Sequence, residues 1–224
     1  MSIVIAIDGT AACGKGTLAK RLARHYGFAH LDSGALYRLV GLGVLDRGGD
    51  PSNAAEAIAS ARNIDTSALE DPRLRSGQAG EAASQVAAIP EVRAAVLDYQ
   101  RQFCVRPPNA ARGAVIDGRD IGTVICPAAT AKLFVDARPE VRAKRRWLEL
   151  KGQNAGSLPD LATLQADLLA RDARDRARPV APLHQAEDAI LLDTSDLDKE
   201  ATFAKALDLV HTSVEKALAV RPRG

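Results

Sequence analysis

The chain has 224 residues, of which 46% are hydrophobic and 26% are charged, and its formal net charge at pH 7 is +2. These values are ordinary for a globular chain with one large core, and they exclude a global field that would attract nucleic acid. No apolar run approaches the roughly 18 residues that cross a membrane, and the start MSIVIAID lacks the basic segment of a secretory signal.

The cysteine content limits the chemistry further. Cys13, Cys104 and Cys126 are an odd number and show no CxxC spacing. This pattern excludes a zinc cluster or a fully paired disulfide framework. We therefore expect a reduced chain in the cytoplasm, with Cys104 and Cys126 in the core.

The first expected element is a strand buried on both faces over residues 2–8. The stretch GTAACGKGT follows, and then a helix with apolar residues at Leu18, Leu22 and Tyr26 ends at Gly27. A strand, a glycine-rich turn and a helix form the context in which backbone N–H groups bind phosphate. The stretch nearly matches the phosphate-loop pattern GxxxxGK-S/T, but Gly16 is inserted before Thr17. The alternative is a glycine turn that only begins a helix.

A phosphate loop assigns roles to its residues. We expect Lys15 to reach the β- and γ-phosphates of ATP and the Thr17 hydroxyl to ligate Mg²⁺. The predicted ATP-binding residues of the loop are Gly9, Thr10, Ala11, Ala12, Cys13, Gly14, Lys15, Gly16 and Thr17. Cys13 is either a reactive thiol in an electropositive loop or a small space-filling residue.

The remaining pattern alternates strands with helices. Buried strands are expected over residues 114–117, 132–137 and 189–193, and helices over residues 34–45, 90–103, 139–150, 161–171 and 198–219. This alternation predicts an α/β fold with a parallel sheet flanked by helices. Residues 46–80 predict an irregular excursion, and residues 151–160 predict a flexible surface loop.

A mixed-charge run, RDARDRAR, ends the fourth of these helices. Arg171, Arg174, Asp175 and Arg178 fall at helical spacing on one face. Such a run commonly forms a solvated salt-bridge face. The alternative is phosphoryl transfer, in which arginines stabilise charge on the transferred group. The acids interrupt the charge and no aromatic residues interleave it, so nucleic-acid binding is not expected.

Five motifs together resemble the bacterial cytidylate kinases, a family of nucleoside monophosphate kinases of the phosphate-loop class. They are GKGT, LDSGALYR from Leu31, AASQVA from Ala82, DGRDIGTV from Asp117 and RDARDRARPVAPL from Arg171. The resemblance extends from Ile3 to about Asp193. Thr10 stands where the family often has proline, and residues 60–80 show no strand pattern, so the family's small β-sheet appendage is expected to be reduced.

The resemblance implies a single phosphate-loop kinase domain over residues 1–224, with a mobile NMP-binding region at about 32–112 and a short lid at about 142–160. It implies that ATP·Mg²⁺ phosphorylates CMP and dCMP, with no nucleic-acid or membrane partner and a monomeric state. The implied catalytic residues are Lys15, Arg119, Asp120 and Arg174, and the implied Mg²⁺ ligands are Thr17 and Asp117.

The resemblance also distributes the acceptor contacts. Ser33, Tyr37, Arg38 and Arg119 would hold the 5′-phosphate. Ser84, Arg171 and Asp175 would hold the ribose, and Arg93, Asp120 and Arg178 would read the base. Arg142, Arg145 and Arg146 would close over ATP from the lid.

The implied base contacts suit cytosine, because the carboxylate of Asp120 can accept from the exocyclic N4 while arginines donate to N3 and O2. Uracil would instead place an oxygen against the carboxylate, and two hydrogen-bond acceptors would then face each other. A preference for CMP over UMP is therefore expected.

Alternatives stay open at this stage. Asp117 could be a turn cap, Asp32 and Ser33 an N-cap, and Arg142 an exposed helix charge. A uridylate or shikimate kinase, a nucleic-acid-stimulated ATPase and a structural protein remain rival functions.

Overall fold

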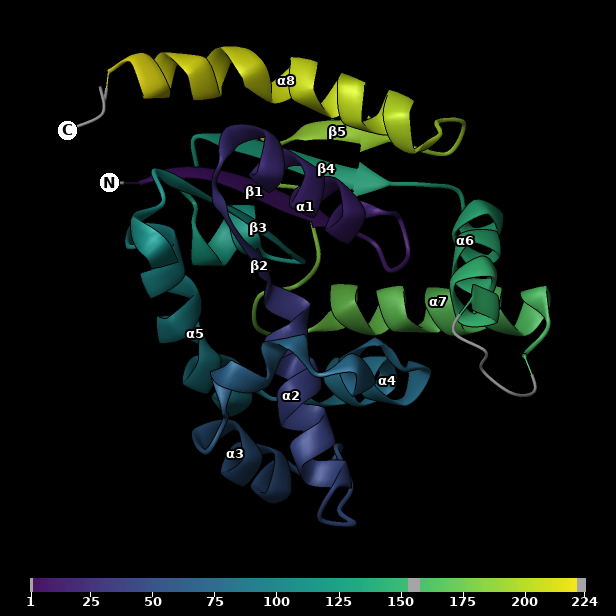
Figure 1. The fold of residues 1–224 in the computed structure, drawn as a ribbon. Helices are drawn as coiled ribbons and strands as arrows, with labels where there is room; N and C mark the ends of the chain where they lie inside the picture. Colours follow the sequence, from purple (N-terminus) through teal and green to yellow (C-terminus); the bar gives the residue numbers. More distant parts are fainter. Residues whose placement is uncertain (1, 153–157, 221–224) are drawn as a thin grey trace.

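The computed structural model describes residues 2–152 and 158–220, and a five-stranded sheet lies at its centre (Figure 1). The strands pair in parallel in the order β2-β3-β1-β4-β5. They are β1 (Ile3–Gly9), β2 (Ala29–Asp32), β3 (Gly113–Gly118), β4 (Ala131–Asp136) and β5 (Ile190–Asp193). The predicted α/β fold with a parallel sheet is confirmed.

Helices cover both faces of the sheet. They are α1 (Lys15–Tyr26), α2 (Ser33–Leu45), α3 (Ala54–Arg62), α4 (Gly77–Val86), α5 (Pro90–Val105), α6 (Pro139–Gly152), α7 (Leu161–Ala177) and α8 (Lys199–Ala219). Short helical turns are η1 (Thr66–Glu70), η2 (Pro72–Arg75), η3 (Pro108–Ala110) and η4 (Ile121–Ile125). Side chains of α1 and α8 pack on Ile3, Ile5 and Ile7 of β1, whereas Cys104 and η4 pack on Val4 and Ala6 from the other face. No helix in the described part of the chain is long and apolar enough to span a bilayer.

The carboxyl ends of three neighbouring strands meet at one edge of the sheet. In the ladder Asp8 pairs with Gly118, and Gly9 pairs with Val135. A Cβ on Gly9 would lie 2.0 Å from the Val135 carbonyl oxygen, so only glycine fits where β1 turns into the following loop. This edge is where the open end of a parallel α/β sheet presents its ligand-binding loops.

A second core lies outside the sheet, among α2, α3, α4 and α5. Leu36 and Val40 of α2 pack with Ala57 of α3, Val86 of α4 and Val92 of α5. In Figure 1, α2, α3 and α4 lie below the sheet, and α5 rises from them along its side. The expectation of an irregular excursion over residues 46–80 is therefore wrong in part, because α3 and the start of α4 are regular helices there. Residues 60–80 contain no strand, as predicted for a reduced appendage.

Two strand predictions need correction. β2 was not predicted, because it has only four residues and two of them, His30 and Asp32, are polar. β5 was predicted to be buried, but Ile190 and Leu191 are exposed because β5 is an edge strand. Helix α6 continues through Lys151 and Gly152, where a loop was expected. Residues 153–157 of that predicted loop and of the predicted lid lie outside the described residues.

Candidate active site

The loop after β1 has the geometry of an anion-binding turn. Ala12 and Gly14 have positive φ values of 57° and 96°, which turn the backbone around the start of α1. Gly14 occupies the N-cap position of α1 and makes no side-chain capping bond, so the first N–H groups of the helix are left for a ligand. Lys15 Nζ donates to the Thr10 carbonyl at 3.0 Å.

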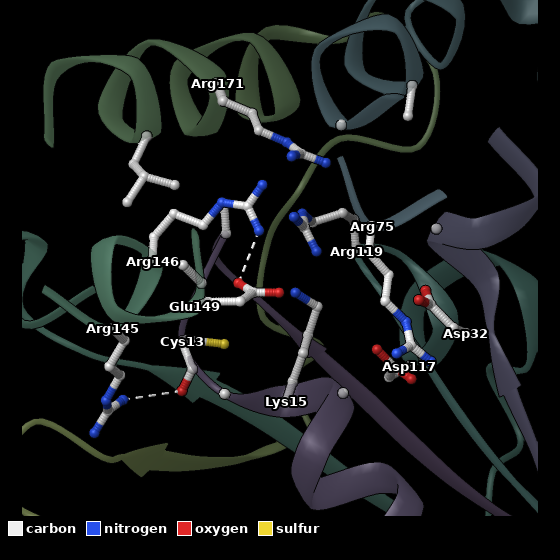
Figure 2. Close-up of a pocket in the computed structure, with 18 of the residues that line it drawn as sticks. Cys13, Lys15, Asp32, Arg75, Asp117, Arg119, Arg145, Arg146, Glu149 and Arg171 are labelled. Carbon is white, nitrogen blue, oxygen red and sulfur yellow. Dashed lines mark hydrogen bonds and ion pairs between the residues drawn. The ribbon is translucent and has the colours of Figure 1, made fainter. Parts of the chain in front are cut away.

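A cavity of about 1330 Å³ extends from this loop to α2, α4 and α7. Figure 2 shows Lys15, Arg75, Arg146 and Arg171 projecting into the space above the loop. Burial and the neighbouring Arg119 lower the pKa of Lys15, and the same two causes lower the pKa of Arg171. The Nε of Arg171 is buried and has no hydrogen-bond partner among the described residues. This cluster of positively charged side chains is suited to binding a polyanionic ligand.

The far wall of the cavity pairs its arginines with acids. Arg93 of α5 forms a buried ion pair with Asp120, and Arg178 forms another with Asp175. Arg119 Nε donates to the second Asp175 oxygen at 2.9 Å. Burial alone would raise the pKa of Asp175, but these arginines hold it below its usual value. Asp175 and Arg178 are only 1% and 8% exposed. At these two residues, the charged run RDARDRAR therefore does not form the solvated salt-bridge face that was one of its two interpretations.

Two residues of α2, Ser33 and Arg38, form hydrogen bonds near the same wall. Ser33 Oγ accepts from Gln100 Nε2 at 2.7 Å, and Arg38 donates to Asp32 at 2.9 Å. Asp32 occupies the N-cap position of α2, as the capping alternative supposed. Its side chain, however, accepts no hydrogen bond from the helix N–H groups, so it does not act as a cap. Burial raises the pKa of Tyr37 to about 12, which keeps its hydroxyl protonated.

The cavity brings most of the predicted site residues together. From the loop these are Ala11, Ala12, Cys13, Gly14, Lys15, Gly16 and Thr17. From the rest of the chain they are Ser33, Tyr37, Arg38, Ser84, Arg93, Asp117, Arg119, Asp120, Arg145, Arg146, Arg171, Arg174, Asp175 and Arg178. Gly9, Thr10 and Arg142 do not line it.

The three lid arginines have different surroundings. Arg142 is 3% exposed, so the alternative of an exposed helix charge is wrong, and it donates to Asp172 at 2.5 Å. Arg145 donates to the Cys13 carbonyl at 3.2 Å and to the Thr194 carbonyl at 2.6 Å. Arg146 donates to Glu149 at 2.7 Å and faces the cavity (Figure 2).

Asp117 lies in β3 beside the phosphate loop. Its Oδ2 is 3.6 Å from where a Cβ on Gly16 would lie, and its Oδ1 is 2.9 Å from His30 Nε2. It is thus a strand residue, and the turn-cap alternative is wrong. Thr17 and Asp117 both line the cavity and carry a hydroxyl and a carboxylate, the kinds of oxygen donor that Mg²⁺ binds.

Sequence reasoning missed several residues of this site. Arg75 of η2 lines the cavity, but it lies in a stretch that gave no periodic signal. Asp172 was interpreted only as one of the acids that interrupt the charged run RDARDRAR. No sequence pattern indicates that it contacts the phosphate loop at Ala11. His30 was not predicted as a site residue, because the histidines of the chain show no metal-ligand spacing. It lies on β2, two residues before Asp32, and contacts Asp117.

A parallel sheet with a lysine-bearing phosphate loop, and a cavity that joins this loop to a wall of arginine–carboxylate pairs, defines a phosphate-loop kinase. The family model for cytidylate kinase matches residues 5–212. The chain therefore belongs to the cytidylate kinase family, and its reaction is the ATP-dependent phosphorylation of CMP to CDP.

Individual relatives agree with this assignment. A cytidylate kinase of Rhodopseudomonas palustris (strain BisA53) is 55% identical over 208 residues, which are 93% of this chain and 96% of the relative. A cytidylate kinase of Bradyrhizobium diazoefficiens is 50% identical over 222 residues, which cover 99% of this chain and 100% of the relative. An uncharacterized protein from Eubacterium ventriosum shares the fold alone, with a TM-score of 0.54, 14% identity, and coverage of 94% of this chain and 99% of that one.

Proposed function

We propose that the chain transfers the γ-phosphoryl group of ATP·Mg²⁺ to CMP and dCMP by direct attack of the acceptor phosphate, giving CDP and dCDP. The observation that carries this proposal is the single cavity that reaches from Lys15 to the Arg93–Asp120 pair. A donor triphosphate and an acceptor nucleotide can lie end to end in such a space. Reactions of this kind are catalysed chiefly by positioning and by cationic stabilisation.

The donor is proposed to bind at the phosphate loop. Backbone N–H groups of the loop would hold the β-phosphate, except that of Ala11, which donates to Asp172, and Lys15 would bridge the β- and γ-phosphates. Thr17 and Asp117 would hold Mg²⁺, Asp117 through water. The ion would neutralise charge on the phosphate oxygens. Arg145 and Arg146 would complete the donor side from the lid.

The acceptor is proposed to bind on the opposite wall. Ser33, Tyr37, Arg38 and Arg119 would hold its 5′-phosphate, and Ser84, Arg171 and Asp175 would hold its ribose. Arg93, Asp120 and Arg178 would read the cytosine. This assignment is supported by the burial of Asp120 at 2%, because the O4 of uracil would face a buried carboxylate with no hydrogen between them, which is costly and so rejects the wrong base.

Closure would precede chemistry. The NMP-binding region at about 32–112 and the lid at about 142–160 would exclude water, which would otherwise accept the phosphoryl group. Arg174 is a candidate to join the transferred phosphate, since it is exposed and, among the described residues, is held only by Glu81 at 2.7 Å and Ser84 at 3.4 Å. We further propose that the protein works as a monomer in the cytoplasm.

One assay separates this proposal from its rivals. ADP release is measured by a coupled assay with CMP, dCMP, UMP, AMP and shikimate as acceptors. The proposal expects turnover with CMP and dCMP far above that with the other three. Equal efficiency with UMP would contradict the base contacts, and stimulation by RNA or DNA with indifference to CMP would favour the ATPase rival.

A further inference from the structure

A buried carboxylate of α7 holds the backbone of the phosphate loop. Asp172 is 0% exposed, and its Oδ1 accepts from the Ala11 N–H at 2.9 Å. Its Oδ2 accepts from Arg142 of α6 at 2.5 Å. Arg142 in turn donates to the Ala11 carbonyl at 3.0 Å and to the Ala137 carbonyl at 2.9 Å. Both backbone groups of Ala11 are thus bound by one buried ion pair.

This contact occurs where the loop needs support. Ala12, the next residue, has φ 57°, a left-handed conformation that a residue with a Cβ adopts only when its surroundings enforce it. The Ala11 side chain also packs against Ala143 of α6 and Leu164 and Leu168 of α7. The turn is therefore stabilised from outside the loop, by α6 and α7.

We propose that Asp172 and Arg142 are positioning residues for the donor site, which fix the phosphate-loop turn without touching a substrate. This role replaces the direct ATP contact expected for Arg142, whose guanidinium is engaged by Asp172, Ala11 and Ala137. The inference rests on the proposed function, because it takes the loop after β1 as the site of ATP.

The same helix extends this role to the acceptor. Asp172 faces the phosphate loop, and Asp175, three residues later, binds Arg119 and Arg178 on the acceptor wall. α7 thus connects the backbone of the donor loop with the acceptor contacts through one rigid element. A loosened Asp172 contact should disturb ATP more than CMP, because the acceptor contacts of Asp175 are left in place.

The test compares nucleotide affinities with stability in folded variants, by calorimetric titration of ATP·Mg²⁺ and of CMP and by thermal unfolding. Asp172→Asn keeps the shape of the side chain but removes its charge. We expect a roughly tenfold loss of ATP affinity with CMP affinity changed less than about twofold. Asp46→Asn is the matched control, because it removes an exposed carboxylate that is also bound to an arginine, Arg73, and it should change neither affinity.

A double variant separates positioning from stability. Arg142→Met with Asp172→Leu removes both buried charges, and such replacements often preserve or raise stability. We expect its melting temperature to return toward that of the wild type while its ATP affinity stays low, because the Ala11 N–H still lacks its acceptor. Recovery of both quantities together would overturn the proposal.

Three other outcomes are decisive. If the double variant does not fold, Arg142→Lys serves instead, since one ammonium can keep the charge pair but cannot reach all three acceptors. We expect it to weaken ATP binding severalfold, and unchanged ATP affinity would overturn the proposal. Equal losses of ATP and CMP affinity in Asp172→Asn would also overturn it. A wild-type protein that binds neither nucleotide would instead refute the proposed function.

Discussion

Arg93 and Asp120 form a buried ion pair that joins α5 to the loop after β3. Arg93 lies on α5 and its guanidinium is 5.3 Å from the ring centroid of Tyr37, whereas Asp120 follows β3. A cation stacked near an aromatic ring and paired with a carboxylate has a restricted orientation. The two side chains therefore present donors and acceptors in a fixed arrangement at the end of the cavity.

Asp120→Asn should shift the choice of base. An amide offers a donor as well as an acceptor, so the penalty for the O4 of uracil falls while the bond to the cytosine N4 weakens. We expect the kcat/KM for CMP to fall by about 10- to 100-fold, in line with about 1–3 kcal/mol for a good base contact, and the CMP-to-UMP ratio to narrow. Steady-state kinetics with both acceptors measure this, and an unchanged ratio would refute the role of Asp120.

Arg75→Ala should weaken phosphate binding. Arg75 projects into the cavity near Arg171 and Lys15 (Figure 2), and within the described part of the chain its side chain forms no hydrogen bond or ion pair that the substitution would break. We expect the kcat/KM for CMP to fall about tenfold, while the weaker binding of cytidine, which has no phosphate, stays unchanged. Arg73→Ala is the control, because Arg73 binds Asp46 and Asp71 on the surface. Equal effects of the two substitutions would contradict a phosphate contact.

ATP binding should take up protons at alkaline pH. Burial and Arg119 lower the pKa of Lys15 in the free protein, so part of the population loses its proton as pH rises toward that pKa. A bound phosphate favours the charged amine and raises the pKa again, so ATP binds more weakly above this pH and binding is coupled to protonation.

The measurement is the calorimetric heat of ATP binding at pH 9 in two buffers of different ionisation enthalpy, compared with pH 7. Uptake should be larger at pH 9. It should disappear in Lys15→Arg, whose guanidinium keeps its proton. Uptake that persists undiminished in this variant would assign the proton to another group.

Cys13 should react slowly with alkylating reagents, because its side chain is 1% exposed and packs with Leu18 and Leu22 in the core. Cys126 should react first, since it is half-buried and a hydrogen bond with Cys104 lowers the pKa of its thiol. Mass spectrometry after timed iodoacetamide treatment measures both rates, with and without ATP. Fast labelling of Cys13 that ATP prevents would instead identify a reactive loop thiol.

The fold was largely predictable, because buried parallel strands such as β1 and amphipathic helices such as α8 leave clear periodic patterns. β2 was missed because four residues with alternating polarity carry too little signal, and its place in the sheet depends on pairing with β3. α3 and α4 were missed as parts of a core because their alanine-rich faces are only weakly apolar, yet they bury Ala57, Ala79 and Ala83 against α2.

The candidate site was predictable where function leaves a local motif. Lys15 and Asp120 belong to such motifs, and the structure brings them to one cavity. Arg142 shows where prediction from sequence fails, because the many charged residues of α6 suggest an exposed helix. Only the packing of α6 on α7 shows that its charge is buried against Asp172. Contacts that join residues 161 positions apart, such as Ala11 with Asp172, leave no trace in local spacing.

The position of two aspartates on α7 sets a length scale for the reaction. Three residues of an α-helix advance by about 4.5 Å, so Asp172, which holds the phosphate loop, and Asp175, which binds Arg119 and Arg178, are separated by less than one helical turn. Inserting one residue between them would rotate one carboxylate about 100° away from the other. In the proposed reaction, this spacing would therefore fix how far apart the two nucleotides are held.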